Sequence, residues 1–149
     1  MAFSRILLPT DFSEFSLAAC SPAIELARAF AGRIDLLFVL EDLPPVPIAT
    51  FEHLPFGTTE RFYEESRGRA AETMEETVLA RIPEAVRGES HILRGPAAHT
   101  IVQAARDFGT DLIVVSTHGR SGLKNALLGS VTERIVRTAP CPVLTVRGE

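Results

Sequence analysis

The most informative part of the chain is residues 111–146, DLIVVSTHGRSGLKNALLGSVTERIVRTAPCPVLTV. It begins with an apolar run, continues through a loop that contains Gly119, and reaches Gly129-Ser130 at the start of an amphipathic segment. A Pro-Cys-Pro segment at 140–142 then leads into a last apolar run. A strand, a glycine-containing loop and a helix N-terminus form the arrangement in which backbone N–H groups hold phosphate. These residues therefore predict an α/β fold with a candidate nucleotide site.

Further apolar segments along the chain predict the rest of the sheet. Their apolar cores are continuous rather than alternating, which is typical of strands covered on both faces in a parallel sheet. A weaker strand is predicted near Glu89–Leu93. The stronger strands are Phe3–Leu8, Ile34–Leu40, Asp111–Ser116 and Pro142–Val146.

Helical patterns lie between these strands. An apolar stripe with three- to four-residue spacing runs from Leu17 to Ala31, with Ser13 or Ser16 as its N-cap. Pro22 either kinks this helix or marks a late start. Strands that alternate with helices predict an open, doubly wound parallel sheet with helices on both faces. The other helices expected are Thr59–Ile82, with Tyr63, Ala70, Met74 and Val78 inward, Ala97–Phe108, with Ile101, Ala104 and Ala105 inward, and Ser130–Thr138, with Val131, Ile135 and, as a further candidate, Val136 inward.

The composition is that of an ordinary globular protein. Of the 149 residues, 46% are apolar and 23% are charged, which indicates one domain spanning 1–149. The formal net charge of −4 argues against binding to nucleic acid or to an anionic membrane, and no apolar run approaches the length of a membrane span. Cys20 and Cys141 are far apart, which is typical of reduced thiols. We therefore expect a cytoplasmic protein without a metal site of its own.

Two predicted strand ends carry polar residues that could share one ligand. The first strand ends at Pro9-Thr10-Asp11 and the fourth at Ser116-Thr117-His118-Gly119. If these strands are neighbours, both loops open onto one crevice at the carboxyl edge of the sheet, where such folds bind ligands. The basic residues between His118 and Arg137 outnumber Glu133 by four to one, a local charge of +3 that suits an anion.

Glycine spacing in the last third strengthens the phosphate hypothesis, although a structural reading stays open. Gly119 allows close approach of the backbone to a ligand, and Gly129-Ser130 offers N–H groups and a hydroxyl at a helix start. The alternative is that the glycines only form turns and that Ser130 only caps a helix. A Walker A motif is absent. The long segment Asp42–Thr58 contains four prolines and is either functional or mobile.

The chain resembles the universal stress protein family over nearly its whole length. The residues that carry the resemblance are Ile6–Ser13, Leu37–Val39, Asp111–Val114, Ser116–Arg120, Leu128–Val131 and Pro140–Leu144. Nucleotide-binding members carry glycine, two residues, glycine, nine residues, then glycine and serine or threonine. Gly119, Gly129 and Ser130 match the later positions of this pattern, whereas Ser116 stands where the first glycine is expected.

The resemblance implies a fold, a ligand and an assembly. The fold is a five-stranded parallel sheet of order 3-2-1-4-5, similar to the adenine nucleotide alpha hydrolases, and the last strand, Pro142–Val146, pairs across a homodimer. The ligand is ATP, or AMP or ADP, with any Mg²⁺ or Mn²⁺ carried in by the nucleotide. The implied binding residues are Pro9, Thr10, Asp11 and Val39 around base and ribose, and Ser116, Gly119, Arg120, Gly129, Ser130, Val131 and Thr132 around the phosphates.

Alternative interpretations of these residues remain. Asp11 could cap the following helix, Val39 could be only a core residue, and Arg120 could be a solvated loop charge. At the level of function, we expect a nucleotide-binding stress-response protein with no catalytic residue. The alternatives are a regulatory dimer that binds no nucleotide, for which Ser116 is the main support, and a weak ATPase or adenylyl transferase.

Overall fold

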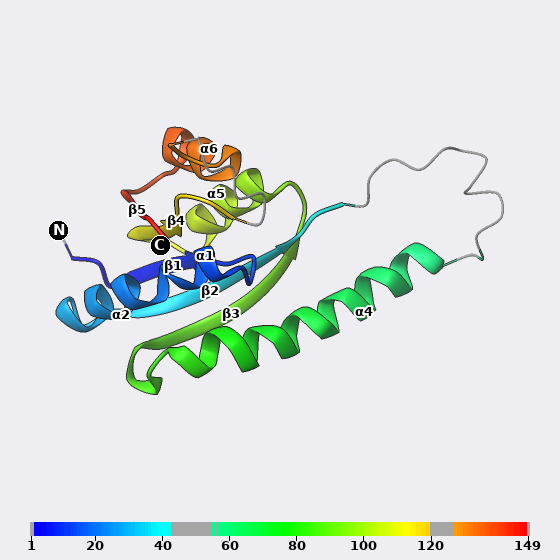
Figure 1. Cartoon of the computed structure of the whole chain (residues 1–149), viewed down its shortest axis with the longest axis horizontal. Helices are drawn as coiled ribbons and strands as arrows, with labels where there is room; N and C mark the ends of the chain where they lie inside the picture. Colours follow the sequence, from blue (N-terminus) through cyan, green and yellow to red (C-terminus); the bar gives the residue numbers. More distant parts are fainter. Residues whose placement is uncertain (1, 43–54, 56, 120–126, 149) are drawn as a thin grey trace.

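The computed structural model describes residues 2–42, 55, 57–119 and 127–148, and it contains a five-stranded sheet (Figure 1). The strand order is β3-β2-β1-β4-β5, and every pair of neighbours is parallel. This confirms the predicted fold class and sheet order. The strands are β1 (Arg5–Pro9), β2 (Arg33–Leu40), β3 (Arg87–Arg94), β4 (Leu112–Ser116) and β5 (Val143–Val146).

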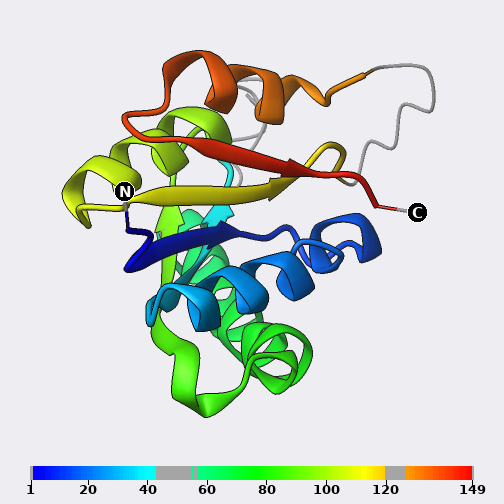
Figure 2. The ribbon, with the colours of Figure 1, turned by 90° about the vertical axis from the view of Figure 1, so that its left-hand side faces the viewer.

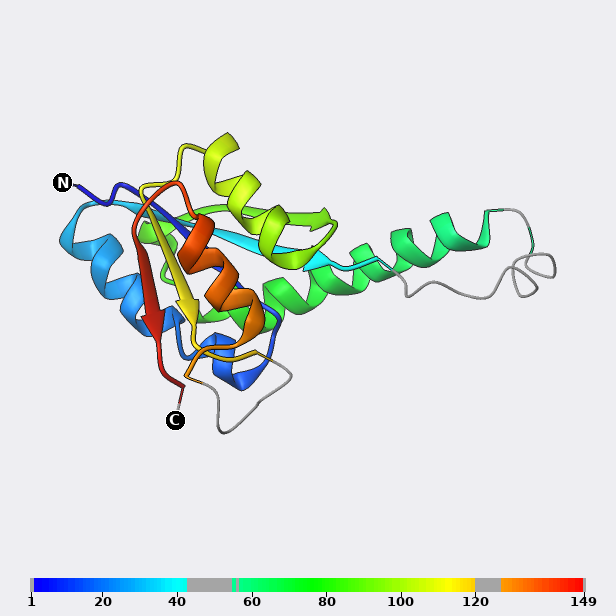
Figure 3. The same cartoon turned by 90° about the horizontal axis from the view of Figure 1, so that it is seen from above.

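Helices cover both faces of the sheet (Figure 2). On one face lie α1 (Glu14–Leu17), α2 (Cys20–Ala29) and α4 (Thr58–Thr73), which continues through a π-helical turn (Met74–Val78) and a short 3₁₀ turn (Leu79–Arg81). On the other face, α5 (Ala97–Asp107) and α6 (Ser130–Thr138) lie side by side (Figure 3). A further 3₁₀ turn, Glu84–Val86, precedes β3. Among the described residues, no helix is both long and apolar enough to cross a membrane.

The central strands bury both of their faces, which explains their continuous apolar sequence. In β1, Ile6 and Leu8 pack toward α2, whereas Leu7 packs toward α5, and all three are fully buried. Val114 and Ile113 of β4 divide between the two faces in the same way. Side chains that alternate between two covered faces need apolar residues at every position.

The first predicted helix is divided in two. Ser13 caps α1 by accepting a hydrogen bond from Ser16 N at 3.2 Å, and the helix breaks after Leu17 before α2 begins at Cys20. Pro22 therefore lies in the first turn of α2, where its missing N–H costs no intrahelical bond. Of the two readings of Pro22, the late start is correct.

The last helix has the predicted bounds, but its buried face differs from the expectation. Ile135 is fully buried as predicted, and Thr132 is its buried companion. Val131 and Val136 are 37% and 45% exposed, so the prediction that they face inward is wrong. Residues three apart share a helix face, whereas Val131 and Val136 flank that face on either side. In α4 and the turn that continues it, the predicted stripe of Tyr63, Ala70, Met74 and Val78 is buried.

A buried carboxylate ties three strands together at the amino edge of the sheet. Asp35 of β2 is 1% exposed, and it accepts hydrogen bonds from Arg5 Nε of β1 and from Glu89 N of β3, both at 2.8 Å. The β2–β3 register shifts beside it, between Ile34 and Leu36. A Cβ at Gly88 would overlap Asp35 Oδ1, so glycine is required there. The carboxylate thus accepts hydrogen bonds from the Glu89 N–H, beside the irregular register, and from the Arg5 side chain.

We predict that Asp35→Ala lowers the free energy of unfolding by about 2–3 kcal/mol, because it leaves the part-buried Glu89 N–H without its acceptor and Arg5 without its partner. Urea denaturation followed by circular dichroism measures the change. Glu72→Ala, at an exposed position of α4, is the control and should change the same quantity by no more than about 0.5 kcal/mol. Equal losses in the two variants would show that Asp35 does not tie the strands.

Candidate functional site

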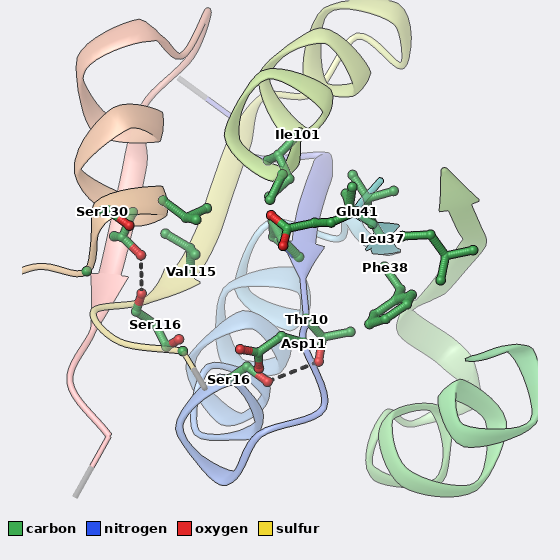
Figure 4. A pocket seen from close by; sticks show the side chains of 18 residues that line it. Thr10, Asp11, Ser16, Leu37, Phe38, Glu41, Ile101, Val115, Ser116 and Ser130 are labelled. Carbon is green, nitrogen blue, oxygen red and sulfur yellow. Dashed lines mark hydrogen bonds between the residues drawn. The ribbon is translucent and has the colours of Figure 1, made fainter. Parts of the chain in front are cut away.

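A cavity of about 460 Å³ lies at the carboxyl ends of β1, β2 and β4 (Figure 4). Its floor comprises Pro9, Val39 and Val115, one from each strand. Each lies two residues after an apolar residue that packs on the α5 side, so the alternation of the strands brings the three to one face. Ala97 and Ile101 of α5 contribute further apolar lining. The volume falls in the range of small-ligand pockets.

The cavity gathers most of the residues predicted from the sequence. Arg120 lies outside the described residues, as does most of the Asp42–Thr58 segment. The predicted residues that line the cavity are Pro9, Thr10, Asp11, Val39, Ser116, Gly119, Gly129, Ser130, Val131 and Thr132. Residues separated by more than a hundred positions thus meet at one edge of the sheet.

The loop after β1 is held by its own polar side chains. Thr10 Oγ1 accepts from Phe12 N at 3.0 Å and lies 3.1 Å from Ser16 Oγ. Asp11 Oδ1 accepts from both the N–H and the hydroxyl of Ser13, at 2.9 and 2.5 Å. Asp11 therefore supports the cap residue Ser13 rather than acting as the cap itself.

The other carboxylate oxygen of Asp11 lies against the loop after β4. A Cβ built on Gly119 would lie 2.5 Å from Asp11 Oδ2. The two loops are therefore close enough that a side chain at position 119 would displace the carboxylate. The expectation that both loops open onto one crevice holds, and the absence of a side chain at Gly119 is what lets them approach.

Phe12 adopts a backbone conformation that is costly for an aromatic residue. Its φ is 65°, in the left-handed region that glycine favours. Its ring stacks on Phe38 of β2, with centroids 4.4 Å apart and planes at 13°. The stacking and the Phe12 N–Thr10 Oγ1 bond keep the chain in this turn, which carries Asp11 over the end of β1. Strain of this kind gathers at functional sites.

The end of β4 is tied to the start of α6. Ser116 O accepts from Thr132 Oγ1 at 2.8 Å, and Thr117 O accepts from Gly129 N at 2.6 Å. The Ser116 hydroxyl donates to His118 O at 2.6 Å, and the residue is 5% exposed. The hydroxyl of Ser116, the residue that stands where the family pattern has glycine, therefore forms its hydrogen bond with the backbone of its own loop.

The N-terminus of α6 borders the cavity, and its N-cap residue has no side chain that could cap the helix. Gly129 is the N-cap and offers no hydroxyl or carboxylate to the first turn. Glu133 N makes the first intrahelical bond, to Gly129 O, so the N–H groups of Ser130, Val131 and Thr132 have no intrahelical acceptor. Such N–H groups, together with the helix dipole, favour an anion.

Several cavity residues were not predicted from the sequence. Glu41 lies two residues after Val39, so strand alternation could have pointed to it, and Ala97 follows the Gly95-Pro96 turn that starts α5. Ser16, Leu37, Phe38, Leu40, Ile101 and Val115 complete the set. Among the described residues, no three His, Cys, Asp or Glu side chains gather closely enough to hold a metal ion.

Other proteins with this sequence pattern and architecture are known. The family model described as "Universal stress protein family" matches residues 2–147. Universal stress protein MJ0531 of Methanocaldococcus jannaschii is 33% identical over 146 residues, which cover 97% of this chain and 82% of that protein. Among solved structures, universal stress protein UspA from Lactobacillus plantarum has a TM-score of 0.82 at 24% identity, with 99% of each chain covered.

Two more distant solved structures were determined with nucleotides. A universal stress protein in complex with cAMP has a TM-score of 0.64 at 22% identity and covers both chains in full. The universal stress protein from Archaeoglobus fulgidus in complex with dAMP also has a TM-score of 0.64, at 20% identity, with 97% of this chain and 98% of that chain covered. The family match over residues 2–147 and the 33% identity to MJ0531 over 97% of this chain show that the chain belongs to the universal stress protein family.

Proposed function

We propose that this protein binds an adenine nucleotide, ATP or else AMP or ADP, in the cavity at the carboxyl edge of its sheet. The observation that carries the proposal is that one cavity joins the uncapped N-terminus of α6 to an apolar floor of Pro9, Val39 and Val115. A nucleotide combines an anionic end with a flat apolar base, which matches this combination. The relatives solved with cAMP and dAMP support the same ligand class.

The cavity suggests how the parts of the nucleotide would be held. The phosphates would accept hydrogen bonds from N–H groups at the start of α6 and from the Ser130 hydroxyl. The base would lie over the apolar floor beside Val39, and Asp11 would accept from the adenosine part. Arg120 would add a phosphate contact, and Mg²⁺ or Mn²⁺ would enter with the nucleotide and neutralise part of its charge.

The serine at position 116 is compatible with this ligand. Its hydroxyl donates to His118 O and so has a partner within the loop. A polar group that is satisfied in this way costs little to keep beside a ligand. The main argument for a family member that binds no nucleotide is therefore weak.

We further propose that the protein acts as a single-domain, cytoplasmic homodimer in stress adaptation, without a defined catalytic reaction. β5 pairs only with β4 among the described residues, and Leu144 within it is 37% exposed. An uncovered apolar edge strand is a hazard that pairing with a second copy removes. The residues available for that pairing are Pro142–Val146.

The first prediction from the proposed function concerns the ligand itself. Protein purified in low-phosphate buffer should release an adenine nucleotide on denaturation, or should bind ATP in calorimetry once it has been freed of nucleotide. Ser130→Ala should weaken binding by about three- to tenfold, since it removes one of several phosphate donors. Protein that neither carries nor binds an adenine nucleotide would contradict the proposal. ATP turnover that Ser130→Ala abolishes would instead favour the weak ATPase.

The second prediction concerns the approach of the two loops. Gly119→Ala should weaken ATP binding by about tenfold, since the new methyl group displaces the Asp11 carboxylate. Gly68→Ala in α4 is the matched control, because a Cβ there meets no atom within 4 Å. Calorimetry on both variants provides the comparison. Equal affinities for ATP would show that the position of Asp11 does not matter to the ligand.

The third prediction concerns Ser116. Ser116→Gly should leave the ATP dissociation constant within about threefold and lower the free energy of unfolding by about 1 kcal/mol, through the lost bond to His118 O and the added chain freedom. Ser116→Ala separates these two causes, because it removes the hydroxyl alone. A loss of affinity of about tenfold, or 1.4 kcal/mol, in both variants would show that the hydroxyl contacts the ligand.

A further inference from the structure

A further carboxylate, that of Glu41, was not predicted from the sequence and lines the cavity just after the end of β2. Glu41 follows the last residue of β2 and, by strand alternation, lies on the same side as Leu37 and Val39. Figure 4 shows its carboxylate directed into the cavity, near Ile101. At this position the side chain could meet a ligand without any change in the fold.

Glu41 is not engaged elsewhere in the part of the chain that the structure describes. No hydrogen bond or ion pair joins it to another described residue, whereas its neighbour Asp42 accepts from Arg94 Nε at 2.8 Å. Arg94 also lies 3.5 Å from the centre of the Tyr63 ring and approaches Glu60. The nearby cation is thus held by other groups, and Glu41 remains an acceptor at the cavity wall.

The sheet order places chemically different groups at the two ends of the cavity. Since β1 lies between β2 and β4, the backbone of Glu41 and the α6 N-terminus are at opposite sides of the cavity, and Asp11 follows the strand between them. Backbone N–H donors at the α6 side attract an anion. A carboxylate at the β2 side accepts hydrogen bonds and repels anions and other acceptors. A ligand that fits both sides has phosphate at one end and N–H donors at the other.

We propose that Glu41 selects the base of the nucleotide by accepting a hydrogen bond from its exocyclic amino group. The inference rests on the proposed nucleotide function, and it specifies which base the site prefers. With phosphate at α6, the sugar falls over β1 beside Asp11 and the base reaches Val39 and Glu41. Adenine presents its amino group as a donor there, whereas hypoxanthine presents a carbonyl oxygen that an ionised carboxylate repels.

The test pairs a change in the protein with a change in the ligand. Calorimetry would give the dissociation constants of ATP, of purine riboside triphosphate, which lacks the amino group, and of inosine triphosphate. These would be measured for the native protein, Glu41→Leu and Glu41→Gln. Glu72→Gln, with the same charge change on an exposed position of α4, is the control. Thermal melting would check that all four proteins are folded.

The native protein should prefer ATP to purine riboside triphosphate by about tenfold, which corresponds to 1.4 kcal/mol. In Glu41→Leu this preference should fall to within about twofold, while purine riboside triphosphate binds at least as well as before. Glu41→Gln should gain affinity for inosine triphosphate, because the amide donates to the base carbonyl. Glu72→Gln should keep the native preference.

Different failures would be distinguishable. An unchanged ATP preference in Glu41→Leu, with ATP still bound, would overturn the role of Glu41 and leave the nucleotide function intact. The affinity for 2′-deoxy-ATP tests the ribose instead. If the native protein prefers ATP to 2′-deoxy-ATP and Glu41→Leu loses this preference, Glu41 contacts the ribose and the base assignment is overturned. If the native protein binds none of these nucleotides, the proposed function and this inference both fail.

Discussion

The parallel pairing of β1 between β2 and β4 is the constraint on which the site depends. It makes the loops after β1 and β4 leave the sheet at the same edge, so that Asp11 Oδ2 comes to lie against Gly119. It also places Pro9 beside Val39 and Val115 in one apolar floor. A one-residue slip of β1 would turn Pro9 to the opposite face of the sheet and remove both features.

The same arrangement divides the cavity into two chemically different ends. The α6 N-terminus supplies donors, and its N-cap residue, Gly129, makes no side-chain hydrogen bond to them. Glu41 supplies an acceptor at the other end. A ligand binds in one orientation when the reversed orientation is unfavourable at both ends of the cavity. Charge of opposite sign at the two ends makes the reversed orientation unfavourable. The fold thus specifies an orientation as well as a place for the ligand.

The sequence predicts the sheet and most of the cavity because these depend on local patterns. Continuous apolar runs identify buried parallel strands, and the bounds of Ser130–Thr138 follow from a glycine cap and a terminal proline segment. The features that it does not predict depend on tertiary contacts. Phe12 occupies a left-handed conformation because Phe38 stacks on it, and the direction of the Ser116 hydroxyl depends on where the loop places His118 O. The prediction that Val136 faces inward was wrong because helical periodicity alone left two possible buried faces.

A crystal structure of the protein with a non-hydrolysable ATP analogue would test the proposed binding mode most directly. We expect phosphate oxygens within hydrogen-bond distance of the first N–H groups of α6 and the base over Val39, with its amino group toward Glu41. A base at the α6 end, or a nucleotide bound outside the cavity, would contradict it.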